Sequence, residues 1–125
     1  MTPSVFMALC VCGAAGACAR WIVDTLVKKC LSPRTHHWGI GLVNLVGCAC
    51  AGALTGWIGS SLPMLLLLST AFLAGFTTFS TAVVDAYRLI RQKRFTAAAG
   101  IVLGVWLGGS ALAVVGFLVA FSFAM

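Results

Sequence analysis

The stretch Ala74-Gly75-Phe76-Thr77-Thr78-Phe79-Ser80-Thr81 lies in the middle of an apolar segment that is long enough to cross a bilayer. Five of its eight positions are glycine or hydroxyl residues, which suit a lipid-facing helix poorly. In hydrocarbon, a backbone N–H or C=O group without a partner is costly, so an interrupted helix persists only where protein covers it or where it lines a pathway. The stretch therefore predicts a break in a membrane helix and a polar site at membrane depth.

The chain outside this stretch is also strongly apolar. Of its 125 residues, 62% are hydrophobic and 8% are charged, and its mean hydropathy is +1.11. A membrane-spanning helix needs roughly 20 apolar residues. Four segments meet this requirement, which we place at residues 4–27, 39–59, 64–87 and 96–123. We predict an all-α membrane protein, a single four-helix domain over residues 1–125 with the break in its third helix.

The positive charges of the predicted loops lie on one side of the membrane. The formal net charge is +6, and seven Lys and Arg residues fall in the first and third loops, with none in the second loop or at the termini: Lys28, Lys29, Arg34, Arg88, Arg91, Lys93 and Arg94. By the positive-inside rule, these two loops are cytoplasmic and both termini are extracytoplasmic. We therefore predict a multi-pass protein of the plasma or inner membrane, with lipid rather than nucleic acid as its partner.

The sequence lacks the patterns typical of catalysis. It contains no Ser-His-Asp set, no paired carboxylates, no nucleotide-binding loop and no metal-ligand cluster, and His36 and His37 fall in the first loop. Two Cys-x-Cys pairs begin at Cys10 and Cys48, but residues two apart on a helix do not face each other. We interpret these cysteines as packing residues and predict that the chain is not an enzyme.

Several polar side chains at membrane depth are hydrogen-bond donors. Arg20 lies deep in the first helix; it can pair with Asp24 one turn later, or it can serve a structural or anion-attracting role. Asn44 lies deep in the second helix, where its amide can form a helix–helix hydrogen bond or contact a ligand. On the fourth helix, Trp106 and Ser110 share one face, and each can donate a hydrogen bond.

Aromatic and acidic residues lie close to the predicted break. Phe76 and Phe79 are packing or lipid-facing residues unless their ring edges, which carry partial positive charge, meet an anion. Asp85, one turn before the third loop, can pair with Arg88 or Arg91. Because donors outnumber acids at this depth, a small anion is the cargo that these residues favour.

The whole chain resembles the Fluc/CrcB family of fluoride channels. The resemblance rests on its length, its four helices and motifs in order along the chain: Gly13-x-x-Gly16-Ala17-x-x-Arg20-Trp21, Gly39-x-x-x-Val43-Asn44-x-x-Gly47, Gly75-Phe76-Thr77-Thr78-Phe79-Ser80-Thr81 and Gly109-Ser110. It implies a passive channel that exports fluoride from the cytoplasm and so relieves its toxicity. It also implies an antiparallel dimer of mutually inverted subunits, with two narrow pores along the interface.

The resemblance and the polar residues described above predict a specific set of site residues. The fluoride pore is expected to involve Asn44, Thr78, Phe79, Ser80, Trp106 and Ser110. Arg20 and Asp85 are expected to be structural or vestibule residues. Backbone carbonyls of Ala74 and Thr77, with Gly75 adjacent, are implied ligands of a structural Na⁺ ion on the dimer axis. Fluoride holds its water tightly, so a selective pore must offer close donors in place of that water.

Some positions depart from the family pattern. The second pore phenylalanine falls on Ala82, a usual threonine falls on Ile40, and a usual hydroxyl position at the end of the polar track is Val114. We interpret these departures as one degraded pore. The substitution Ala82→Phe tests this interpretation, because a regained second pathway favours a channel and no change favours an accessory role. Because the loop charges are strongly one-sided, we predict a heterodimer with a paralogous subunit of opposite topology.

The sequence leaves two alternative functions open. The chain can be a non-conducting accessory subunit of a heterodimeric fluoride channel, which the departures from the family pattern favour. It can also be a small multidrug-type transporter, but such a transporter needs a carboxylate in the middle of its first helix. That depth holds Cys12, Gly13 and Gly16, and Asp24 lies near the end of the helix.

Overall fold

The computed structural model describes residues 2–31, 38–58 and 62–124, so the predicted loop residues Arg34, His36, His37 and Ser60 lie outside the described part. The described residues form five α-helices: α1 (Pro3–Cys30), α2 (Trp38–Ile58), α3 (Pro63–Phe76), α4 (Phe79–Arg91) and α5 (Phe95–Ala124). Four segments are long and apolar enough to cross a membrane, with α3 and α4 together forming the third. The prediction of an all-helical protein with four membrane spans is confirmed.

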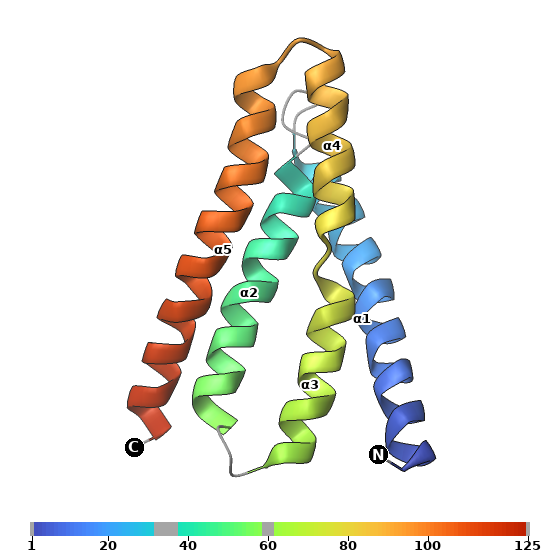
Figure 1. Ribbon diagram of the computed structural model, residues 1–125, viewed down its shortest axis with the longest axis vertical. Coiled ribbons are helices and arrows are strands. Elements are labelled where there is room, and N and C mark those ends of the chain that lie inside the picture. Colours follow the sequence, from blue (N-terminus) through green and yellow to red (C-terminus); the bar gives the residue numbers. More distant parts are fainter. Residues whose placement is uncertain (1, 32–37, 59–61, 125) are drawn as a thin grey trace.

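The four spans run alternately in opposite directions, so that the two ends of the chain lie at the same end of the bundle (Figure 1). The end of α1, the start of α2 and the α4–α5 turn lie at the opposite end, which we call the basic end because Lys28, Lys29, Arg88 and Arg91 occupy the last turns of α1 and α4. α2 packs mainly against α5, and α1 packs mainly against α3. The helices diverge toward the chain termini (Figure 1).

Local sequence explains where several of these helices begin and end. Pro3 and Pro63 stand in the first turns of α1 and α3, where a missing backbone N–H costs nothing and the fixed φ angle suits a helix. Lys28 and Lys29 in the last turn of α1 complement the negative end of its dipole. These helix ends need little support from tertiary contacts.

Glycine allows α1 and α3 to approach each other closely. A Cβ atom at Gly75 of α3 would overlap the carbonyl oxygen of Gly13, and one at Gly16 of α1 would overlap that of Phe72. Small residues at contacts between membrane helices allow the two backbones to touch, which increases the van der Waals contact between the helices. The family motif glycines of α1 and α3 therefore hold the segment before the break against α1.

The α2–α5 contact depends on glycines as well, and their importance differs along the two helices. A Cβ atom at Gly52 would overlap the Ala113 carbonyl, and one at Gly116 would lie 2.6 Å from the Ala49 carbonyl oxygen. By contrast, a Cβ atom at Gly100 or Gly104 would make ordinary contacts with the Trp38 ring, at 3.8 and 3.7 Å. The closest approach of α2 and α5 thus lies in the half of the bundle nearer the chain termini.

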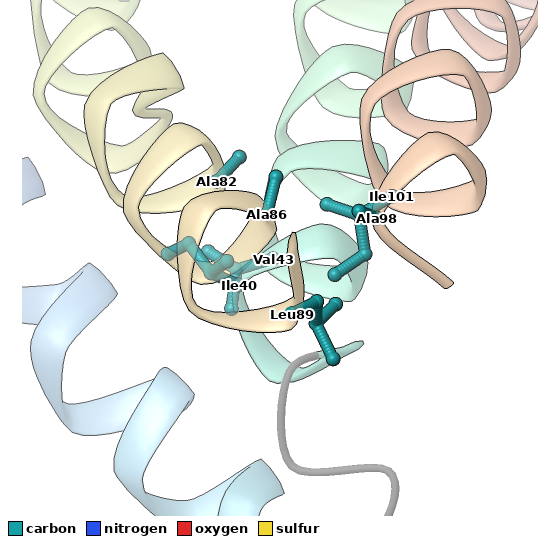
Figure 2. Packing of buried hydrophobic residues seen from close by; sticks show 7 residues of the cluster. All are labelled: Ile40, Val43, Ala82, Ala86, Leu89, Ala98 and Ile101. Carbon is teal, nitrogen blue, oxygen red and sulfur yellow. The ribbon is translucent and has the colours of Figure 1, made fainter. Parts of the chain in front are cut away.

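A cluster of buried apolar side chains joins α2, α4 and α5 near the basic end (Figure 2). We call this cluster the apolar layer; its members are Ile40, Val43, Ala82, Ala86, Leu89, Ala98 and Ile101. Alanine at three of these positions brings the three helices close together, and isoleucine and leucine fill the remaining space. The layer fixes the side of α4 that faces inward.

Candidate functional site

The third membrane span changes conformation near its middle. α3 ends at Phe76, Thr77 and Thr78 are extended with φ and ψ of −86° and 150° and of −151° and 132°, and α4 begins at Phe79. Helix ends leave backbone carbonyls and N–H groups without helical partners. Within the described part of the chain, no hydrogen bond reaches the carbonyls of Ala74 through Thr77. Polar backbone groups are therefore concentrated inside an apolar span.

Asn44 of α2 binds the backbone of the extended segment through both ends of its amide. Its Nδ2 donates to the Thr78 carbonyl at 2.6 Å, and the Thr78 N–H donates to its Oδ1 at 2.8 Å. The Asn44 residue is only 4% exposed. One N–H of the amide remains after these two bonds, because an asparagine amide carries two donors. Asn44 thus positions the start of α4 and keeps one donor for another partner.

A groove of about 410 Å³ runs beside this hydrogen-bond pair. It brings together five of the six predicted pore residues, and its lining comprises Asn44, Cys48, Thr77, Thr78, Phe79, Val105, Trp106, Gly109, Ser110 and Ala113. The sixth, Ser80, joins the site through a 2.9 Å contact between its hydroxyl and that of Thr78. Residues from α2, α4 and α5 therefore meet at the break, although they are far apart in the sequence.

The groove presents several donors and few acceptors. The Thr78 and Ser80 hydroxyls share one hydrogen bond, which leaves one of their two protons available. The Trp106 indole lies on the groove and is without a hydrogen-bond partner among the described residues. The Ser110 hydroxyl donates to the Trp106 carbonyl at 2.8 Å, so its proton is not directed into the groove. In this arrangement Ser110 offers an oxygen to the groove.

A second hollow of about 260 Å³ adjoins the groove at Cys48 and Thr77, which line both spaces. Ala74 and Thr77, the predicted sodium ligands, lie along it together with hydroxyl residues of α2 and α3: Thr55, Ser69 and Thr70. Gly75 lies elsewhere, against Gly13 of α1. Ala74 and Thr77 therefore line one space, whereas Gly75 acts in helix packing.

Arg20 and Asp24 do not form the ion pair that their spacing allows. Asp24 instead pairs with Lys28 at 2.8 Å. Within the described residues, the Nε of Arg20 and the Oδ1 of Asp24 are buried without hydrogen-bond partners. The Asp24 Oδ1 lies near Gly39, at the start of α2, and positive helix ends attract carboxylates. This contact explains why Asp24 turns toward α2 and Lys28.

Asp85 pairs with Arg88 at 3.3 Å, one of the two partners that the sequence suggested. Its carboxyl is buried, with the side chain 8% exposed, and the Oδ2 has no partner within the described part of the chain. Neither Arg20 nor Asp85 lines the groove or the second hollow. Both predicted vestibule residues therefore lie apart from the cluster around the break.

Cys48 is one of the lining residues that the sequence did not single out. It lies four residues after Asn44 on α2 and lines both spaces. Residues four apart share a helix face, so the spacing from Asn44 was a usable signal. Val105, Gly109 and Ala113 also line the groove, and their spacing of four residues on α5 follows the same rule.

Comparison with known proteins gives one consistent result. Residues 7–117 match the family described as CrcB-like protein, Camphor Resistance (CrcB). A protein of Leifsonia xyli subsp. xyli named fluoride-specific ion channel FluC 1 is 35% identical over an alignment of 130 positions, gaps included, that covers 90% of this chain and 93% of the relative. A FluC 2 of Mycolicibacterium paratuberculosis is 38% identical, over 88% of this chain and 89% of its own. A FluC of Gloeobacter violaceus is 35% identical, over 86% and 89%.

Proposed function

The chain belongs to the CrcB family, and from this premise we propose that it is a fluoride-selective passive channel of the cell membrane that exports cytoplasmic fluoride. It is an ion channel subunit and not an enzyme. The observation that carries the proposal is the Asn44–Thr78 hydrogen-bond pair, which holds the start of α4 open beside a donor-lined groove. The names of its relatives and the chemistry of the groove point to the same ion.

The groove suits a small anion that has lost water. The remaining Asn44 N–H, a hydroxyl proton of the Thr78–Ser80 pair and the first N–H groups of α4 are available there. Helix N-termini bind anions through such N–H groups and through the helix dipole. The Phe79 ring at the same place can turn its partly positive edge toward the ion. No single group dominates, which suits conduction because an ion that binds weakly at several sites can leave again.

One protomer forms only part of this pathway. Phe79 and Trp106 are 66% and 65% exposed, so the groove is open on the outer face of the protomer. In a membrane, an ion there would meet lipid unless another subunit covers the face. We therefore include in the proposal an antiparallel dimer, in which an inverted subunit completes two pathways.

A structural Na⁺ ion at the dimer axis is part of the same proposal. The carbonyls of Ala74 and Thr77 lack hydrogen-bond donors within the described residues, and both residues line the second hollow. Hard cations prefer such oxygen ligands, and no group of three or more His, Cys, Asp or Glu side chains lies close together among the described residues. Two carbonyls are too few for one ion, so an inverted copy would have to supply the rest.

A sodium requirement is testable without mutation. Purification and assay in N-methyl-D-glucamine salts, with no Na⁺, is expected to remove most of the fluoride efflux, because the carbonyls at the break would repel one another without a cation. Returning Na⁺ should restore the efflux, and K⁺ serves as the control because the ion is larger. Full efflux in protein that contains no Na⁺ by elemental analysis would contradict the sodium site.

We propose that the partner is a paralogue of opposite topology. The described basic residues of the first and third loops gather at one end of the bundle, while the second loop and the termini carry none. An inverted homodimer would need this chain to insert in both orientations, against the positive-inside rule. The alternative, a non-conducting accessory subunit, is favoured by Val114, which gives an apolar side chain to a hollow between α2 and α5.

Fluoride efflux from liposomes decides between these functions. The chain is reconstituted alone and together with its paralogue, and release is followed with a fluoride electrode and an ionophore that balances charge. We expect fast efflux only from the mixture, with chloride-loaded liposomes as the selectivity control. Fast efflux from the chain alone would contradict the heterodimer, and efflux from neither preparation would contradict the channel function.

A further inference from the structure

We propose that the apolar layer closes the groove toward the basic end within this protomer, and that Ile40 and Ala82 form a complementary large and small pair in that closure. An ion in the groove would then reach the basic end only along the outer face, where a second subunit lies. The inference about ion passage rests on the proposed channel function. The inference about packing stands on the burial of the residues alone.

The apolar layer lies directly beyond the groove on all three helices that line it. Moving from Asn44 toward the basic end, the next residue on the same face of α2 is Ile40. On α4 the position one turn after Thr78 is Ala82, and on α5 the position one turn before Val105 is Ile101. One turn of helix is about 5.4 Å, so the layer begins about one turn beyond the groove lining.

These three residues leave no room for an ion or for water. Ile40 and Ile101 are 0% exposed, and Ala82 is 2% exposed. All members of the apolar layer have aliphatic side chains (Figure 2), so none can replace the water of an anion. Burying an ion without such partners costs far more than a single hydrogen bond returns. The buried polar residue of α4 near this layer, Asp85, is a carboxylate paired with Arg88, and it offers acceptors rather than donors.

The burial of Ala82 changes the interpretation of the substitution Ala82→Phe. The sequence suggested that phenylalanine here would restore a second pathway, but the Ala82 side chain points into the packed contact of α2, α4 and α5 (Figure 2). A phenylalanine needs space that the neighbouring side chains of the layer already fill, and overpacking a dense core is destabilising. Positions 40 and 82, where the chain departs from the family pattern, therefore both belong to the apolar layer.

The packing part of the inference is tested by melting temperatures of purified protein in detergent. Ala82→Phe is expected to lower the melting temperature by about 5 °C or more, because the site is full. Adding Ile40→Ala should recover a large part of that loss, although Ile40→Ala alone also destabilises by leaving a cavity. Ala99→Phe is the matched control, because Ala99 is an exposed residue of α5 and its replacement should leave the melting temperature unchanged.

The closure itself is tested by efflux from whichever assembly conducts. Ile40→Ser places a hydroxyl in the layer and is expected to raise fluoride efflux at least twofold, whereas Ile40→Val keeps the layer apolar and should leave efflux unchanged. An unchanged melting temperature for Ala82→Phe, or no recovery in the double variant, would overturn the paired packing. Unchanged efflux in folded Ile40→Ser protein would overturn the closure. Absence of efflux in every assembly would instead contradict the channel function, and the melting temperatures would still decide the packing.

Discussion

Asn44→Ala is expected to reduce fluoride efflux about 100-fold or more, because it leaves the part-buried Thr78 N–H without its partner, removes the side-chain bond to the Thr78 carbonyl and takes a donor away from the groove. The Thr78 N–H loses its hydrogen bond to the Asn44 side chain, and α4 loses the contact that holds its first turn beside the groove. Efflux from liposomes measures the functional loss. A melting temperature in detergent measures the accompanying loss of stability, which we estimate at about 2 kcal/mol or more.

Two further variants separate positioning from anion binding. Val46→Ala is the matched control on α2, because Val46 is 56% exposed and lines neither the groove nor the second hollow; it should conduct normally. Asn44→Asp keeps an acceptor for the Thr78 N–H, but it has no donor for the Thr78 carbonyl and adds negative charge to an anion pathway. It should therefore lose efflux as fully as Asn44→Ala while melting at a higher temperature. Efflux within twofold of the parent protein in Asn44→Ala would contradict the role of this residue.

The composition of the sequence is sufficient to predict the span count and much of the groove. Hydropathy gives four membrane segments, and the density of hydroxyls around Thr77 points to the segment where α3 gives way to α4. Asn44 stands out because a lone amide in an apolar helix needs a partner. Such features are local, so they can be read from a few neighbouring residues.

The hydrogen-bond and ion-pair partners of the polar side chains could not be predicted in the same way. Asn44 and Thr78 are 34 positions apart, and their pairing depends on how α2 lies against the α3–α4 segment. The pairing of Asp24 with Lys28 rather than Arg20 depends on the nearby start of α2. Local spacing allowed both partners, and only tertiary contacts distinguish them.

The sequence also could not predict which side chains of α4 face the interior of the bundle. Two extended residues, Thr77 and Thr78, separate α3 from α4, so the angular position of each α4 side chain no longer follows from the period of α3. Ala82 was expected beside a pore because the family's second pore phenylalanine falls on that position, whereas the structure places it in the apolar layer.

Gly52→Ala is expected to destabilise the protein by about 3 kcal/mol, although it adds only one methyl group. The new Cβ atom would overlap the carbonyl oxygen of Ala113, a backbone atom that cannot turn aside, so α2 and α5 would have to separate. These two helices form the most extensive contact of the bundle, and both line the groove. Separating them moves Asn44 away from Ser110, and so we also expect fluoride efflux to fall at least tenfold.

Gly100→Ala is the matched control for this prediction, since it makes the same chemical change in a different environment. A Cβ atom at Gly100 would meet only the Trp38 ring, at 3.8 Å, which is ordinary contact. Alanine favours a helix over glycine by up to about 1 kcal/mol, so this variant should melt at the same temperature as the parent protein or slightly higher. The two variants together separate the cost of a methyl group from the cost of parting the helices. Equal melting temperatures for the Gly52→Ala and Gly100→Ala proteins would mean that α2 and α5 can move apart at Gly52 with little loss of stability. The groove would then not depend on this close approach.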